Sequence, residues 1–153
     1  VNLTNANLTN ADLRGANLRD ANPTNSNMSD SNLYGVTLRD ANLFGANFER
    51  TFLRGANLTG ANFYTVNLSE ASLSEANLTA VNLYGANLTN ADLTGSKLFL
   101  ANLALANLTG ANLTGANLEG AVLTGAILTG AVLKGSILTD AVLTDANLAD
   151  ARR

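Results

Sequence analysis

Few side chains in this sequence could do covalent or metal chemistry. The chain has 153 residues and contains neither His nor Cys, which removes the commonest general base, the thiolate nucleophile and the commonest metal ligands. The nearest approach to a catalytic pair is Glu70 with Glu75, and Asp140, Asp145 and Asp150 repeat the same spacing of five. Two paired carboxylates act as acid and base only where a cleft shifts the pKa of one of them. The elements that carry these residues must therefore be identified first.

The spacing of five belongs to the whole chain. Residues 1–150 divide into thirty five-residue words without an insertion or a deletion. The first residue of a word is always small or β-branched, the second is Asn in 19 words, and the fifth is most often Gly, Asn or Asp. The third residue is Leu except at Pro23, Met28, Phe48 and Phe63. Such an unbroken internal repeat indicates a repeat architecture.

A period of five fits no regular helix or continuous strand. In an α-helix, five residues advance about 500°, which spreads the Leu side chains around the cylinder. In a strand, an odd period places successive Leu residues on opposite faces. We therefore expect residues one and three of each word to point inward from a short extended segment, and residues four and five to form a corner that tolerates positive φ. Repeated turning in one sense predicts an all-β solenoid with one inward-facing core.

The residues that vary favour four words per coil. Phe44, Tyr64 and Tyr84 are twenty apart, and so are Arg19 and Arg39. Three words per coil has weaker support, chiefly from Phe48 and Phe63, which are fifteen apart. Four words per coil gives about 7.5 coils and a rod roughly 36 Å long at the usual distance between strands.

The words resemble those of a known family. Sequences such as "ADLRG" at Ala11–Gly15 and "ANLTG" at Ala56–Gly60 are similar to the pentapeptide repeat family, and the resemblance covers residues 1–150. It implies a right-handed parallel β-helix of square cross-section, with the first and third residues of each word inward. Pro23 departs from the pattern at an inward position, and Phe52 and Lys97 depart from it at the second position.

The repeat predicts a single domain over residues 1–153 with a core of stacked side chains. Pro23 has no N–H to donate between coils, so we expect a local defect there. No segment reads as a cap, and the chain is expected to be a fragment or domain of a longer protein. The representative core residues are Leu13, Leu33, Leu53, Phe48, Phe63, Leu113 and Leu133.

Two groups of outward residues could bind a partner. Phe44, Tyr64 and Tyr84 form one expected aromatic ladder, for which packing between coils is the favoured explanation and a partner site is the alternative. An apolar collar, in which the second residue of five successive words is Val or Ile, suits association at an end or docking of a cap, but β-branched residues also simply favour extended backbone. The predicted interaction surface comprises Phe44, Tyr64, Tyr84, Phe99, Leu100, Leu105, Val122, Ile127, Val132, Ile137 and Val142.

Composition narrows the classes of partner. The net charge of −3 argues against direct binding of nucleic acid, and no apolar run approaches the ~18 residues of a membrane span. No cofactor, metal or catalytic residue is predicted. The chain begins at Val1 and shows no signal peptide, so the compartment is open. The cytoplasm is favoured, and the periplasm or thylakoid lumen would apply if a targeting segment had been removed.

Three hypotheses follow. The favoured one is a non-catalytic structural or interaction module that binds an unidentified protein partner or associates with itself through an end. The alternative comes from the resemblance alone, because some pentapeptide repeat proteins mimic DNA, bind DNA gyrase and confer fluoroquinolone resistance. The five Arg residues among residues 1–60 make this chain a poor imitation of a phosphate backbone. An enzyme is the least favoured.

Overall fold

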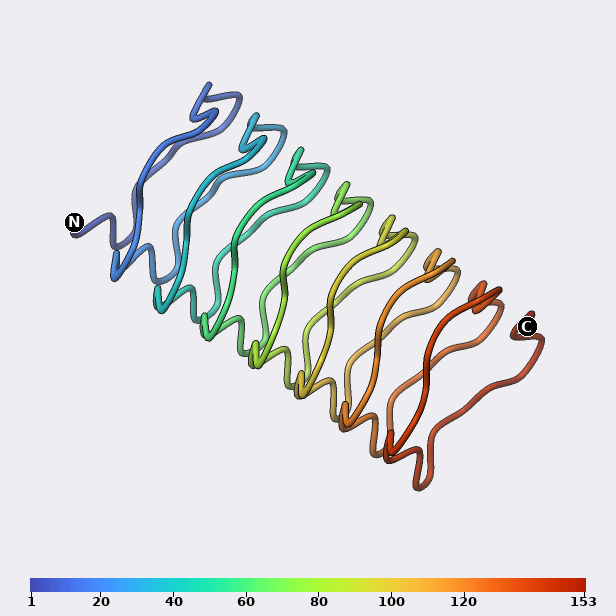
Figure 1. Cartoon of the computed structure of the whole chain (residues 1–153). Helices are drawn as coiled ribbons and strands as arrows, with labels where there is room; N and C mark the ends of the chain where they lie inside the picture. Colours follow the sequence, from blue (N-terminus) through green and yellow to red (C-terminus); the bar gives the residue numbers. More distant parts are fainter.

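The computed structural model describes residues 1–153 as a stack of similar coils that follow one another in chain order from the N-terminus to the C-terminus (Figure 1). The chain contains no helix, and its strands are reduced to one bridging residue per word, at the second position. All bridges are parallel, and each joins residues twenty apart, as Asn62 joins Asn82. Words twenty residues apart therefore stack on one another, and the solenoid is all-β.

The stacked words define four columns, which we call walls 1 to 4. Wall 1 contains the words that begin at residue 1 and every twenty residues thereafter, and walls 2, 3 and 4 begin in the same way at residues 6, 11 and 16. The turn at the fourth and fifth residues of each word forms the corner that leads to the next wall. Each residue thus has a fixed place on a wall or a corner.

Backbone hydrogen bonds hold the coils together in a repeating pattern. In one word, the N–H of Leu83 donates to the carbonyl of Asn102 in the following coil (2.7 Å), and the N–H of Asn82 donates to the carbonyl of Ala61 in the preceding coil (3.0 Å). The corner is closed by the N–H of Ala86, which donates to the carbonyl of Leu83 (3.1 Å). The backbone N–H and carbonyl groups named here are therefore paired with each other, without any side chain.

The corner imposes a left-handed backbone on the fifth residue of every word, with φ between +53° and +68°. Gly, Asn and Asp adopt this conformation at low cost, as the sequence predicts. Seven words nevertheless place other residue types there, at a cost of about 1–2 kcal/mol each. These residues are Arg50, Thr65, Glu70, Glu75, Ala80, Leu100 and Leu105.

The core is one continuous cluster of 42 buried apolar residues inside the four walls. Leu33, Leu53, Leu113 and Leu133 are buried, whereas Leu13, in the first coil, is only partly buried because no coil covers its outer side. Phe48 and Phe63 are both fully buried, and their ring centroids lie 5.6 Å apart at an interplanar angle of 55°. Bulk on two neighbouring walls is thus accommodated by one tilted aromatic pair.

Pro23 interrupts the ladder of wall 1. Its ring occupies a buried position in the column of core Leu residues, but the bridge expected between Asn22 and Asn42 is missing. Proline has no N–H to donate, and the carbonyl of Asn42 accepts only a long contact of 3.4 Å from the Thr24 hydroxyl. Whether this gap softens the coil stays a prediction.

Candidate interaction surfaces

The acidic side chains named above are dispersed over different faces. Glu70 lies at the corner after wall 2 and Glu75 at the corner after wall 3, where Arg54 Nη2 is 2.8 Å from Glu75 Oε1. No three acidic residues approach closely enough to hold a metal ion. The one cavity, of about 450 Å³, lies in the last coil and is lined by Leu133, Gly135, Ser136, Leu138, Leu143 and Arg153. Its Ser136 hydroxyl donates to the carbonyl of Leu133 (2.9 Å), so no acid–base pair faces this space.

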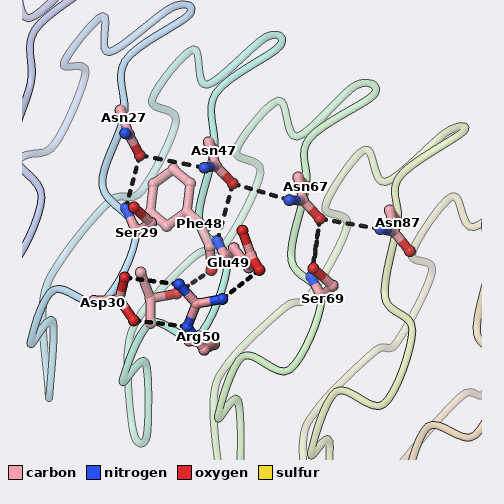
Figure 2. Close-up of polar contacts among 11 residues, drawn as sticks. Asn27, Ser29, Asp30, Asn47, Phe48, Glu49, Arg50, Asn67, Ser69 and Asn87 are labelled. Carbon is pink, nitrogen blue, oxygen red and sulfur yellow. Dashed lines mark hydrogen bonds and ion pairs between the residues drawn. The ribbon is translucent and has the colours of Figure 1, made fainter.

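The Asn at the second position builds a polar ladder that the repeat alone does not reveal. On wall 2, the side-chain amides of three successive Asn residues each donate to the side-chain oxygen of the Asn one coil earlier (Figure 2). Asn47 donates to Asn27 (3.3 Å), Asn67 to Asn47 (2.9 Å) and Asn87 to Asn67 (3.0 Å). Wall 1 carries a second ladder from Asn22 to Asn102. The regular spacing of Asn by twenty residues is the signal in the sequence.

The same Asn side chain caps the corner of its own word. The side-chain oxygen of Asn67 accepts the Ser69 N–H (3.2 Å) and the Ser69 hydroxyl (2.8 Å), besides the amide of Asn87. This is the local side-chain-to-backbone bond that Asn favours in turns. Asn therefore satisfies the only backbone N–H of the corner that the backbone ladder leaves free.

Ion pairs lie only between residues 12 and 75. Arg50 binds both carboxylate oxygens of Asp30 in the preceding coil (2.8 and 2.9 Å) and also contacts Glu49 (Figure 2). The hydrogen bond from Arg50 lowers the pKa of Asp30, and the hydrogen bond with Asp30 raises the pKa of Arg50. Arg14 lowers the pKa of Asp12 in the same way, within a single word. These pairs are exposed, so each contributes little to stability.

The predicted aromatic residues stack along the corner of wall 1. The rings of Phe44 and Tyr64 lie 5.6 Å apart at 12°, and those of Tyr64 and Tyr84 lie 5.2 Å apart at 2°. Phe44 and Tyr64 are exposed, and Tyr84 is half-buried. Packing between coils thus accounts for the rings' positions, and a role in binding stays a prediction.

The apolar collar lies on all four walls. Val122 and Val142 are on wall 1, Ile127 is on wall 2, Val132 is on wall 3 and Ile137 is on wall 4. All are exposed except Val132, which is half-buried. Because the five residues face four directions, one flat partner could cover only part of the collar at a time.

Phe99, Leu100 and Leu105 are exposed at the two corners that flank a single word of wall 1, Ala101–Leu105. The ends of Leu100 and Leu105 reach over the glycine corners of the following coil. Their Cδ2 atoms would lie 2.8 Å and 2.7 Å from a Cβ built on Gly120 and Gly125, respectively. A side chain at either glycine would therefore displace a leucine, and the two leucines remain largely open to solvent.

Comparison with known proteins agrees with the repeat. The family model of pentapeptide repeats matches residues 61–98, 101–140 and 126–152 with eight copies, and that of the pentapeptide repeat region matches residues 1–78. No curated protein matches the chain. No helix is long and apolar enough to cross a membrane.

Several solved structures are similar. HetL, a pentapeptide repeat protein involved in heterocyst differentiation regulation from the cyanobacterium Nostoc sp. strain PCC 7120, is 34% identical, with 95% of this chain and 75% of HetL covered and a TM-score of 0.72. The pentapeptide repeat protein alr5209 from Nostoc PCC 7120 is 35% identical over 60% of this chain and 69% of its own, with a TM-score of 0.39. QnrB1, a plasmid-mediated fluoroquinolone resistance protein, is 18% identical over 92% of this chain and 76% of its own, with a TM-score of 0.35.

Proposed function

The chain belongs to the pentapeptide repeat family, and we propose that it is a non-catalytic module that binds protein through its outer surface. The observation that carries this proposal is the contrast between a continuous core of 42 buried apolar residues and a surface that exposes twelve large apolar residues. Exposed apolar residues that gather on one surface mark sites of protein association. Regulation through binding also agrees with the involvement of HetL in heterocyst differentiation regulation.

The proposal includes the coil geometry of the family. We propose a right-handed β-helix of square cross-section with four words per coil and about 7.5 coils, a value that follows from thirty words at four per coil. Parallel bridges between residues twenty apart support four words per coil. A rod of this kind presents rigid flat walls, which suit protein contacts better than they suit a substrate cleft.

A crosslinking and capture experiment with the full chain tests the proposal. The wild-type chain should capture a defined protein from its source organism, and Ile137→Asp in the collar should reduce the amount captured about tenfold or more. Asn117→Asp is the matched control because it adds the same charge at the same position of wall 4, one coil earlier. Equal capture by all three chains, or none by the wild type, would contradict a binding role for the collar.

Binding to DNA gyrase stays a hypothesis that no structural observation favours. The seven ion pairs tie the five Arg residues of residues 1–60 to nearby acids, so no continuous anionic face imitates DNA there. A gyrase supercoiling assay decides the matter. We expect no inhibition at protein concentrations that saturate partner capture, and inhibition that weakens as salt rises would support the DNA-mimic alternative.

A further inference from the structure

Charge is distributed unevenly over the four walls. The chain has 21 charged residues. Sorted by the bridge columns, five of them lie on wall 2, eight on wall 3 and seven on wall 4, each wall taken with the corner that follows it. Wall 1 carries only Asp145, in its last word. Residues 1–125 therefore contain a face, seven words long, without a single charged side chain.

The exposed apolar residues gather on this same wall. Each wall again taken with the corner that follows it, six of the twelve exposed large apolar residues lie on wall 1, one on wall 2, two on wall 3 and three on wall 4. The six on wall 1 are Val1, Phe44, Tyr64, Leu105, Val122 and Val142. Wall 1 thus combines the lowest charge with the most exposed apolar surface, which is the composition of an interface centre rather than of a solvated face.

Two exposed Leu residues lie at the edges of one word of wall 1. Leu100 and Leu105 have φ of +57°, in the left-handed region that Leu rarely adopts. Both are more than half exposed, at 55% and 54%, so neither conformation nor burial favours Leu at these places in the free chain. They lie one at each edge of the wall 1 word Ala101–Leu105. The corner imposes this backbone on the fifth residue of every word, and five other atypical residues, spread over all four walls, share it. What a contact on wall 1 would cover is therefore the two exposed Leu side chains, not a strained backbone.

We propose that wall 1 is the contact surface for wall 1 of a second copy of this chain, with the two rods side by side. This proposal rests on the function proposed above and adds to it one partner, a second copy of the chain, and the surface that this copy would contact. A charged side chain that is buried without an opposite charge destabilises a contact. Because wall 1 offers no charge to pair with, the surface that packs on it should also be uncharged. Wall 1 is such a surface, and a two-fold interface places the same patch on both subunits.

The available area is sufficient. The total accessible surface is 6619 Å², and one wall takes roughly a quarter of it, about 1,600 Å², or less once the ends are subtracted. A standard interface needs about 800 Å² from each partner, so about half of wall 1 would be enough. The backbone of wall 1 is already paired within the stack apart from the gap at Pro23. The second copy would therefore pack on side chains and would not add a strand.

The test is the solution mass of the full chain by light scattering over a concentration series. We expect the wild type to approach twice 15.8 kDa, and the mass should not fall between 0.1 and 0.5 M salt because the contact contains no ion pair. Val122→Lys should give a monomer. Ile127→Lys is the matched control, because it has the same position in the next word, similar exposure and the same added charge, but lies on wall 2.

A second variant separates loss of contact from loss of fold. Leu105→Gly should raise the melting temperature of the dilute chain, because glycine adopts the corner conformation without strain, and should also weaken the dimer about tenfold. A wild type that stays at 15.8 kDa at all concentrations would overturn the proposal. Equal loss of mass in Val122→Lys and Ile127→Lys would overturn it in favour of the collar. A monomer that still captures a protein partner would reject this dimer and leave the proposed function intact.

Discussion

Two regions of the rod share one backbone but join their coils with different side chains. In residues 21–120, Asn ladders on walls 1 and 2 connect successive coils, and all ion pairs lie between residues 12 and 75. In residues 121–145, Val or Ile replaces the ladder residue, yet the backbone bonds continue, as in the bond from the Val122 N–H to the Ala101 carbonyl (2.9 Å). This difference shows that backbone hydrogen bonds and the core hold the stack together. The second residue of a word can therefore be polar or apolar.

Truncation of a core Leu should have the largest effect on stability, and the same effect in both regions. Leu83 in the ladder region and Leu123 in the collar are both fully buried. Each Leu→Ala change should lower the free energy of unfolding by about 2–5 kcal/mol, through lost burial and the cavity that remains. Urea denaturation of both variants measures these losses. Losses that differ by more than a factor of about two would show that the core is not shared equally by the two regions.

Removal of a ladder Asn should have a smaller effect. Asn67→Val breaks the bonds to Asn47, Asn87 and Ser69 and leaves a half-buried amide without a partner, at a cost of about 1–3 kcal/mol. Asn77→Val on wall 4 is the control, because its side chain only accepts the Thr79 N–H (3.1 Å). Thermal unfolding should rank Asn67→Val below Asn77→Val, and equal melting temperatures would mean that the ladder between coils adds nothing.

Repair of the gap in wall 1 should stabilise the ladder region. Pro23→Leu supplies an N–H that points to the Asn42 carbonyl and restores the residue found at this position in most words. We expect a gain of about 0.5–1.5 kcal/mol from the hydrogen bond, and slower amide exchange in the first two coils. Faster exchange, or a lower midpoint in urea, would show that the surrounding coil is built around the proline ring.

The smallest effect concerns pH and only the first region. The pKa of Asp30 is lowered in the folded state by the hydrogen bond from Arg50, so the pair stabilises the fold above the unfolded pKa of about 3.9. This stabilisation is lost as the pH falls through the lower, folded pKa. Melting between pH 7 and pH 2.5 should therefore depend less on pH in Asp30→Asn than in wild type.

Asp140→Asn is the control for that series. Asp140 has the same corner position and a similar φ of +57°, but it makes no ion pair and lies in the region without them. Its replacement should leave the pH dependence close to that of the wild type. An effect equal to that of Asp30→Asn would attribute the pH dependence to net charge instead of to the Asp30–Arg50 pair.

Most of the fold could be predicted from the sequence because a period of five permits few structures. The inward Leu, the left-handed fifth residue and the family follow from the words themselves, and the resemblance is confirmed by the two family models. The stacking of Phe44, Tyr64 and Tyr84 was also predictable, because residues twenty apart occupy one column.

The candidate surface was harder to predict, since a surface depends on which words share a wall. The collar was predicted as a run along the chain with one residue on each wall, and the bridges place its residues on all four walls. The absence of charge on wall 1 appears only when every twentieth residue is compared. The left-handed backbone of Leu100 and Leu105 follows from their place in the word, but the reach of their side chains over Gly120 and Gly125 could not be predicted from the repeat.

Thiol reactivity measures burial of wall 1 most directly, because the chain contains no native cysteine. Thr124→Cys places one thiol at the corner of wall 1, and Thr129→Cys places one at the equivalent corner of wall 2. As the protein concentration rises, the account predicts that alkylation of Cys introduced at Thr124 slows severalfold while the wall 2 thiol reacts at a constant rate. Equal rates for both thiols at every concentration would contradict the claim that wall 1 is the contact surface.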